Sequence, residues 1–152
     1  MNRAEQETRA RVFLNRLGRI ARRLKLKREQ VQALHELATS ATAQISDMPR
    51  SDSPNLQRLE TLVCKIADLD AEIQQESVEM ETVRLETALM ICRLHDPAYQ
   101  RILTLRYIDN RKWNEIMDEL GYSRSRIFEM HEDALCAMEK LLAESGGEHE
   151  LY

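Results

Sequence analysis

The chain has few of the residues that interrupt regular structure. Its 152 residues include four glycines and three prolines, and aromatic side chains make up 5%. A β-sandwich or β-barrel needs a turn about every ten residues and many β-branched or aromatic positions. The composition therefore disfavours those classes and indicates an all-α protein.

Long apolar runs are also missing. No stretch approaches the roughly 18 apolar residues of a membrane span, and the arginine-rich start lacks the apolar segment of a signal peptide. We therefore expect no membrane association and a cytoplasmic location. The three cysteines, Cys64, Cys92 and Cys136, have no CxxC spacing and predict reduced thiols.

Motifs for catalysis or cofactor binding are absent from the sequence. The histidines are far apart, and no HxxxH, CxxC or HxE spacing suggests a zinc site. No glycine-rich phosphate loop or GxSxG motif occurs. We interpret Glu72, Glu76, Glu79 and Glu81 as a solvated helix face, because they follow one another along a predicted helix. The expectation is a protein without enzymatic activity, metal or cofactor.

What the chain does have is a strong charge asymmetry. Its formal net charge is −4, but residues 1–35 hold ten basic and three acidic residues, whereas residues 36–96 hold five basic and twelve acidic ones. Such a division indicates either an internal electrostatic match or a basic face for a polyanion. For the cluster Arg19–Arg28 we favour the internal match, with an auxiliary DNA contact as the alternative.

Two heptad patterns predict a long antiparallel helical hairpin over residues 1–96, similar to a coiled coil. The first pattern breaks at Lys27, and its apolar members are Phe13, Leu17, Ile20, Leu24, Val31, Leu34, Ala38, Ala41 and Ile45. The second breaks at Glu76 and Thr87, and its members are Leu59, Leu62, Ile66, Leu69, Ile73, Met80, Val83, Met90 and Leu94. Between them, residues 47–54 contain two prolines and predict a loop.

A further apolar stripe lies off the second heptad seam, at Val78, Leu85, Leu89 and Cys92. A helix that is apolar on both faces is buried on both. We therefore expect this stripe to meet either the C-terminal part of the chain or another subunit. A thin hairpin has little core of its own, which predicts a homo-oligomer, in the first place a dimer.

Three shorter helices are predicted after Pro97, over residues 97–108, 111–120 and 123–142, followed by a flexible polar tail at 143–152. Gly121 can close the second of these helices, Tyr122 can plug the turn, and Ser123 is a good N-cap for the third. Two helices joined by a short turn with glycine predict a helix-turn-helix, whose second helix enters the DNA major groove. Trp113 is expected to pack beneath this motif.

The exposed start of that second helix carries Arg124, Ser125 and Arg126, with Glu129 one turn later. Arginine can bond to guanine through two atoms, and a helix N-terminus favours a phosphate. We predict that these four residues reach bases. The DNA backbone contacts are assigned to Arg111, Lys112 and Ser123, and His131 is a further phosphate contact or a solvated surface side chain.

The C-terminal residues resemble region 4 of bacterial sigma factors. The resemblance rests on Leu105-Arg106-Tyr107, Trp113-x-x-Ile116, Leu120-Gly121-Tyr122-Ser123 and Ala134-Leu135. Over residues 10–142 the chain is similar to a narrower group, the sigma-region-4-like phage and prophage regulators of the ArpU/RinA type. This similarity rests on the motifs above together with Ala38-Thr39-Ser40, Met48-Pro49, Lys65-Ile66-x-Asp68-Leu69 and His131-x-x-Ala134-Leu135. This resemblance implies a three-helix, sigma-region-4-like module and places Arg124, Ser125, Arg126 and Glu129 on its base-reading face. Phe128 departs from the pattern, since sigma factors often have a basic residue there.

The resulting hypothesis is a phage or prophage transcription regulator that binds specific double-stranded DNA and acts on late genes, with RNA polymerase as a further partner. Two alternatives remain open. One is a DNA-packaging adaptor similar to a small terminase, and the other is a coiled-coil module that contacts RNA polymerase without binding DNA. The acidic residues on the second helix of the helix-turn-helix, together with Phe128, favour the module that contacts RNA polymerase. Non-specific DNA affinity depends on neutralising phosphates, which acidic residues cannot do.

Overall fold

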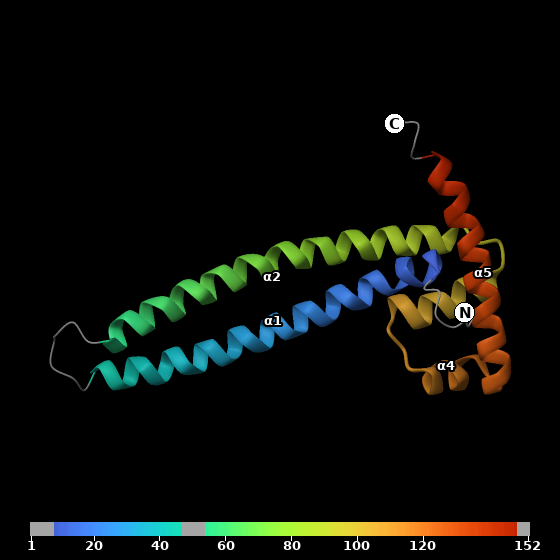
Figure 1. Ribbon diagram of the computed structural model, residues 1–152. Helices are drawn as coiled ribbons and strands as arrows, with labels where there is room; N and C mark the ends of the chain where they lie inside the picture. Colours follow the sequence, from blue (N-terminus) through green and yellow to red (C-terminus); the bar gives the residue numbers. More distant parts are fainter. Residues whose placement is uncertain (1–7, 47–53, 149–152) are drawn as a thin grey trace, which may run out of the picture. The chain divides into compact units, whose positions relative to one another are not determined.

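The computed structural model describes residues 8–46 and 54–148, and these segments form helices without any strand (Figure 1). The prediction of an all-α protein with two long N-terminal helices that pack together is confirmed. The elements are α1 (Arg9–Ser46), α2 (Pro54–Cys92), α3 (Pro97–Leu103), the π-helical η1 (Thr104–Ile108), α4 (Trp113–Leu120) and α5 (Arg124–Glu148). Pro54 is the first residue of α2, and the rest of the predicted loop lies outside the described residues.

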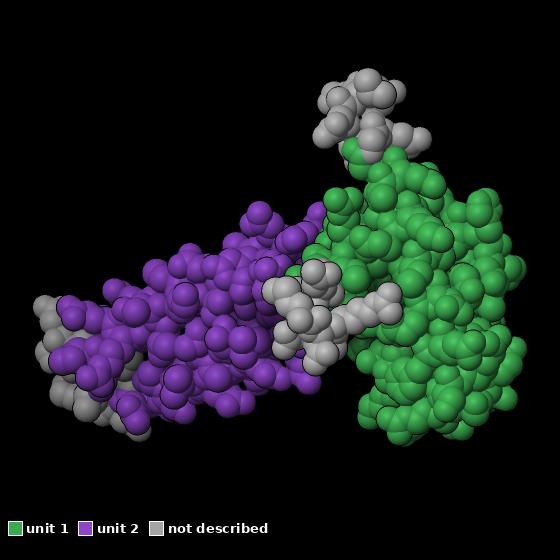
Figure 2. All heavy atoms as spheres, turned by 45° about the vertical axis from the view of Figure 1, so that its right-hand side comes forward, with its two compact units in different colours: residues 1–19, 81–152 green, residues 20–80 purple. Residues whose placement is uncertain are grey.

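The chain forms two compact units (Figure 2). Residues 20–80 form one, here named the hairpin unit, and residues 1–19 with 81–152 form the other, here named the globular unit. The predicted boundary after residue 96 lies inside the globular unit. The reason is that Ala10 and Leu14 of α1, and Ile91 and Leu94 near the end of α2, belong to the same apolar core as α3–α5.

In the hairpin unit, α1 and α2 run antiparallel, and the predicted heptad positions face inward. Ile20, Leu24, Ile66 and Leu69 are buried. The Nζ atom of Lys27 lies 2.7 Å from Oε1 of Glu76 and 3.2 Å from Oε2 of Glu72. The polar breaks of the two heptad patterns therefore meet, and Glu76, whose side chain is 15% exposed, does not belong to a solvated face.

Four other basic residues of the cluster on α1 are more exposed than Lys27. Arg22, Arg23, Lys25 and Arg28 are exposed. The pKa of Lys27 is raised, mainly because its ammonium group bonds to Glu76. The expected match between basic α1 and acidic α2 is thus seen at Lys27.

In the globular unit, polar contacts hold the first part of α1 and the last part of α2. Arg16 Nη2 lies 3.1 Å from Glu86 Oε2, which joins α1 to α2. Thr87 is fully buried, and its hydroxyl donates to the carbonyl of Val83 at 2.7 Å. Because its own helix satisfies the hydroxyl, Thr87 fits an apolar seam at little cost.

The helix predicted over 97–108 has two parts. Asp96 caps α3 by accepting from the Ala98 backbone N–H at 2.9 Å. After Leu103 the backbone widens into η1, where the Asp109 N–H donates to the Thr104 carbonyl at 2.9 Å. Asn110 then adopts φ +52°, a conformation that asparagine tolerates better than most residues, and the chain turns toward α4.

Helix α5 is longer than predicted, since it continues to Glu148 instead of ending at residue 142. Leu141 and Leu142 pack against the core, and Arg93 Nη1 donates to Ser145 Oγ at 2.9 Å. Leu141 and Leu142 belong to the predicted helix, whereas Ser145 lies in the segment that composition alone assigned to a flexible tail. Residues 149–152 of that predicted tail lie outside the described residues.

The apolar stripe on the outer side of α2 is not covered by α3–α5. Val78, Leu85 and Leu89 are 70%, 61% and 59% exposed, and Cys92 is also exposed. The expectation that the C-terminal helices cover this stripe is therefore wrong, and contact with another subunit stays a prediction. None of the described helices has the length and apolar character needed to span a membrane.

Candidate nucleic-acid interface

The turn between α4 and α5 depends on Gly121. Its φ is +71°, and its N–H donates to the Met117 carbonyl at 2.9 Å, which closes α4. A Cβ atom at this position would meet nothing within 4 Å. Glycine is therefore favoured here by the left-handed backbone, as predicted, and not by lack of space.

Ser123 begins α5 as the predicted N-cap. Its hydroxyl oxygen accepts from the Arg126 N–H at 3.3 Å, and its carbonyl accepts from the Ile127 N–H at 3.0 Å. Residues 121–126 are all exposed. The first turn of α5, with its partial positive charge, thus lies at the surface of the globular unit. Tyr122 is 48% exposed, so the expectation that it plugs the turn is wrong.

The two arginines of the first α5 turn have contacts on their own helix. Arg126 Nη1 lies 3.2 Å from Glu129 Oε1, three residues later. The Arg124 guanidinium lies 5.5 Å from the centre of the Phe128 ring. Both arginines, Ser125 and Glu129 remain exposed. An exposed pair of this kind contributes little to stability, which leaves both guanidinium groups available to a ligand.

An aromatic cluster joins the start of α4 to α5. The Trp113 ring, at the start of α4, lies 5.2 Å from the Phe128 ring and 4.8 Å from the His131 ring, centre to centre. Trp113 is half-buried and packs against the core, and its place beneath a helix-turn-helix stays a prediction. Since Phe128 is also the residue under Arg124, the cluster joins the core to the first turn of α5.

His131 belongs to this cluster and not to the surface. It is 5% exposed, and its Nε2 lies 2.8 Å from the Tyr107 hydroxyl. Burial, with the charges of Arg11 and Arg106, lowers the pKa of His131 to about 4. Burial likewise raises the pKa of Tyr107. The prediction of a solvated side chain at His131 is therefore wrong, and its burial also argues against the predicted phosphate contact.

Arg111 and Lys112 precede α4 and are exposed, as a role at the surface requires. Arg111 Nη1 lies 3.6 Å from Glu119 Oε2, and the Lys112 backbone N–H donates to Glu115 Oε2 at 3.4 Å. The segment is thereby tied to α4 at both residues. Both side chains lie in the same compact unit as the first turn of α5.

Arg106 is a residue whose structural role the sequence did not reveal. Its Nη1 donates to the Arg111 carbonyl at 3.0 Å, and its guanidinium lies 4.6 Å from the centre of the Trp113 ring. It thus joins η1, the segment before α4 and the aromatic cluster. Arg106 stands in the Leu105-Arg106-Tyr107 triplet, but a single basic residue in an amphipathic pattern gives no signal for such a contact.

Acidic side chains flank the candidate interface. Glu129 and Asp133 are exposed on α5. Glu132 Oε1 lies 2.7 Å from Arg11 Nη2, so its charge is matched by α1. The exposed carboxylates on this part of α5 are thus Glu129, which pairs with Arg126, and Asp133.

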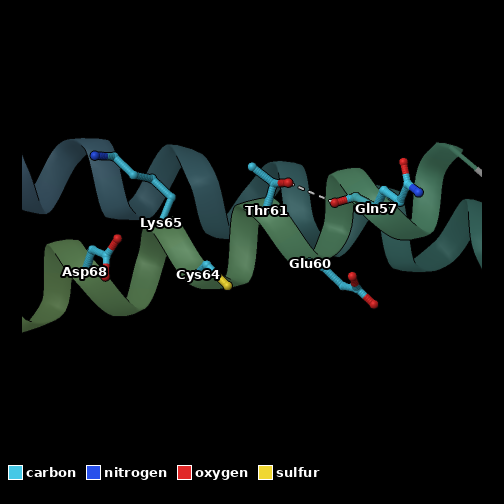
Figure 3. A pocket seen from close by; sticks show the side chains of 6 residues that line it. All are labelled: Gln57, Glu60, Thr61, Cys64, Lys65 and Asp68. Atoms are coloured by element: carbon cyan, nitrogen blue, oxygen red, sulfur yellow. Dashed lines mark hydrogen bonds between the residues drawn. The ribbon is translucent and has the colours of Figure 1, made fainter.

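Other surface features offer less for a ligand. A shallow depression lies along α2 in the hairpin unit (Figure 3), lined by Gln57, Glu60, Thr61, Cys64, Lys65 and Asp68. The Thr61 hydroxyl is turned back to the Gln57 carbonyl, to which it donates at 2.9 Å. In residues 8–46 and 54–148, no three His, Cys, Asp or Glu side chains are grouped as metal ligands.

A family model described as "Protein of unknown function (DUF1492)" matches residues 58–139. The match covers more than half of the chain, from the second turn of α2 into α5. Comparison with curated proteins gave no match. Comparison with solved structures gave none either.

Proposed function

The chain belongs to this DUF1492 family, and we propose that it is a transcription regulator of a phage or prophage that binds specific double-stranded DNA. In this proposal α4, the turn and α5 act as a sigma-region-4-like helix-turn-helix, and the protein regulates late genes in the cytoplasm. Its activity is binding and not catalysis.

The observation that carries the proposal is the exposed first turn of α5. Arg124, Ser125 and Arg126 are exposed there directly after a glycine turn and a serine cap. Guanidinium groups can donate to guanine O6 and N7 together, and serine can bond to bases or phosphates. A positioned, capped helix start with two arginines is the arrangement by which such helices contact base edges.

The remaining surface residues fit supporting roles. Arg111 and Lys112 lie before α4, where they would hold a phosphate and position the module without reading sequence. Ser123 would add a backbone contact at the helix N-terminus. Glu129 would accept from a cytosine amino group, provided that Arg126 leaves its ion pair for a guanine.

The acidic flank predicts how strongly the module binds. Glu129 and Asp133 repel phosphates, so one module should bind weakly and lose affinity steeply as salt is raised. Two linked modules that contact two half-sites, or a tether to RNA polymerase, would compensate for this weak affinity.

The test is selection of genomic fragments from a phage or host genome by the purified full-length protein. The proposal predicts that one sequence motif is enriched, and that excess competitor DNA of unrelated sequence does not displace it. Recovery of fragments without any shared motif, at the level of a DNA-free bead control, would refute sequence-specific binding.

A second candidate function is favoured by the exposed Tyr122 in the turn before α5 and by the exposed Glu129 on α5. An aromatic and acidic surface suits a protein partner better than a polyanion. In that case α5 would contact RNA polymerase without DNA. Capture of core polymerase by the full-length protein, lost with Tyr122→Ala and unaffected by nuclease, would favour this alternative over direct DNA binding.

A further inference from the structure

The outer side of α2 carries apolar side chains in a regular row. At about 100° per residue, its exposed large apolar residues fall within about 80° of helix arc. They are Leu56, Val63, Val78, Leu85 and Leu89. Cys92, also exposed, lies on the same side. Scattered exposed apolar residues need no explanation, but a row on one face indicates a contact surface.

The row is densest between Val78 and Cys92, where apolar residues recur at intervals of seven, four and three. This is the spacing with which one helix packs against another. The inward heptad positions of the same stretch are buried on the opposite side, as Val83, Thr87 and Ile91 show. The outer row is therefore a second helix-packing surface, here named the outer seam (Val78, Leu85, Leu89, Cys92).

Charged residues run along one edge of the outer seam at heptad intervals. They are Glu79, Glu86 and Arg93. Glu86 is already matched by Arg16, at 3.1 Å. Glu79 is exposed, and Arg93 is exposed and donates to Ser145, a neutral acceptor, at 2.9 Å. The edge thus has a negative charge at one end, a neutralised one in the middle and a positive charge at the other end.

Such an edge is complementary to a reversed copy of itself. When two outer seams pack antiparallel around a two-fold axis near Leu85, Glu79 of each copy lies beside Arg93 of the other. Leu85 then meets Leu85 at the axis, and Val78 lies opposite Cys92. A parallel pairing would instead set this edge against the opposite edge of the other seam, so that Glu79 and Arg93 would not meet.

We propose that the outer seam is the surface through which two copies of this chain associate, antiparallel, as a dimer. A two-fold contact uses the same patch on both copies, which a single self-complementary seam provides. The association does not depend on DNA binding, but it would supply the two linked modules that weak DNA contacts need.

The first test is the mass of the full-length protein without DNA, measured by sedimentation over a range of concentrations. The wild type should show a monomer–dimer equilibrium, and Leu85→Glu should weaken it at least about tenfold, because both copies place this residue at the axis. Val63→Glu is the matched control, since Val63 is 55% exposed on the same face but lies outside the overlap. A monomer at every concentration, or a ring of eight or more subunits, would overturn the proposal.

Charge reversal tests the orientation. Arg93→Glu should weaken the dimer, and the combination of Glu79→Arg with Arg93→Glu should restore it, because the antiparallel pairs are then exchanged. Thiol pairing gives a second measure in protein with Cys64 and Cys136 replaced by serine. Val78→Cys should form a disulfide with Cys92 of the other copy on oxidation by glutathione disulfide. A disulfide between two Cys92 residues without that change would show a parallel dimer and overturn the arrangement.

Because these measurements contain no DNA, their failure leaves the proposed DNA binding untouched. Conversely, a dimer that selects no motif would refute only the proposed function. Loss of DNA binding by Leu85→Glu, with the mass unchanged, would show that the outer seam contacts another molecule instead of a second copy.

Discussion

Lys27 and Glu76, the polar residues that interrupt the inner seams of α1 and α2, form an ion pair with 2.7 Å between Nζ and Oε1. The other carboxylate oxygen of Glu76 is buried and accepts no hydrogen bond from the residues that the structure describes. A pair in this position fixes which residues of α1 lie opposite which of α2, because any shift along the seam would place both charges among apolar side chains.

Removing one partner of this pair should destabilise the hairpin more than removing both. Lys27→Met leaves the carboxylate of Glu76 without its cation, so we expect a clear fall in the thermal midpoint. The double variant Lys27→Met, Glu76→Leu should regain most of that loss, since apolar residues fit the seam. Circular dichroism melts of the four proteins in the cycle measure the coupling, and additive effects would show that the ion pair is not coupled across the seam.

Gly121→Ala should lower the free energy of unfolding by about 1 kcal/mol, because alanine is strained at positive φ. The space around the glycine is open, so no steric term adds to this cost. Gly146→Ala is the matched change within helix α5, where alanine should instead stabilise by up to about 1 kcal/mol. Denaturant unfolding measures both, and equal effects of the two substitutions would contradict the assigned role of Gly121.

Because of His131, the free energy of unfolding should fall in mild acid. Its pKa in the folded protein is about 4, against an ordinary value of 6.5, so between these values the unfolded chain binds more protons. Stability therefore falls as pH is lowered through this window, by about 2 kcal/mol between pH 7 and pH 5 from this group alone.

His131→Gln should remove this part of the pH dependence, and His95→Gln, at an exposed position, should leave it unchanged. Unfolding free energies of the three proteins at the two pH values give the comparison. If His131→Gln loses as much stability on acidification as the wild type does, the buried neutral imidazole is not the cause.

The parts of the fold that repeat in sequence could be predicted, and single contacts could not. The period of the apolar residues predicted both seams, and glycine followed by serine predicted the cap of α5. The burial of His131 was missed because it depends on Tyr107 and Trp113, which approach it from other elements. The length of α5 was underestimated because the polar residues after Leu142 give no sign of a contact such as that between Arg93 and Ser145.

The division into two compact units was also beyond the sequence. A heptad pattern that runs from Leu59 to Leu94 gives no sign that its last part joins another core. The structure places Ile91 and Leu94 with Ala10 and Leu14 beside α3–α5. In the candidate interface, exposure of Arg124 and Arg126 was predicted from their place at the start of a helix after a glycine turn, whereas the ring of Phe128 under Arg124 required coordinates.

The central claim, that the first turn of α5 contacts DNA, is tested most directly by the affinity of the full-length double variant Arg124→Ala, Arg126→Ala for the selected duplex. Fluorescence anisotropy over a range of salt concentrations gives both affinity and salt dependence. The matched control is Arg58→Ala, Lys65→Ala, which removes the same charge from exposed positions on α2.

We predict that the α5 variant loses specific binding, with a salt slope close to that of the wild type because both arginines are assigned to bases and not to phosphates, while its circular dichroism spectrum and the control's affinity stay unchanged. Equal affinity of the α5 variant and the wild type for that duplex would contradict the account.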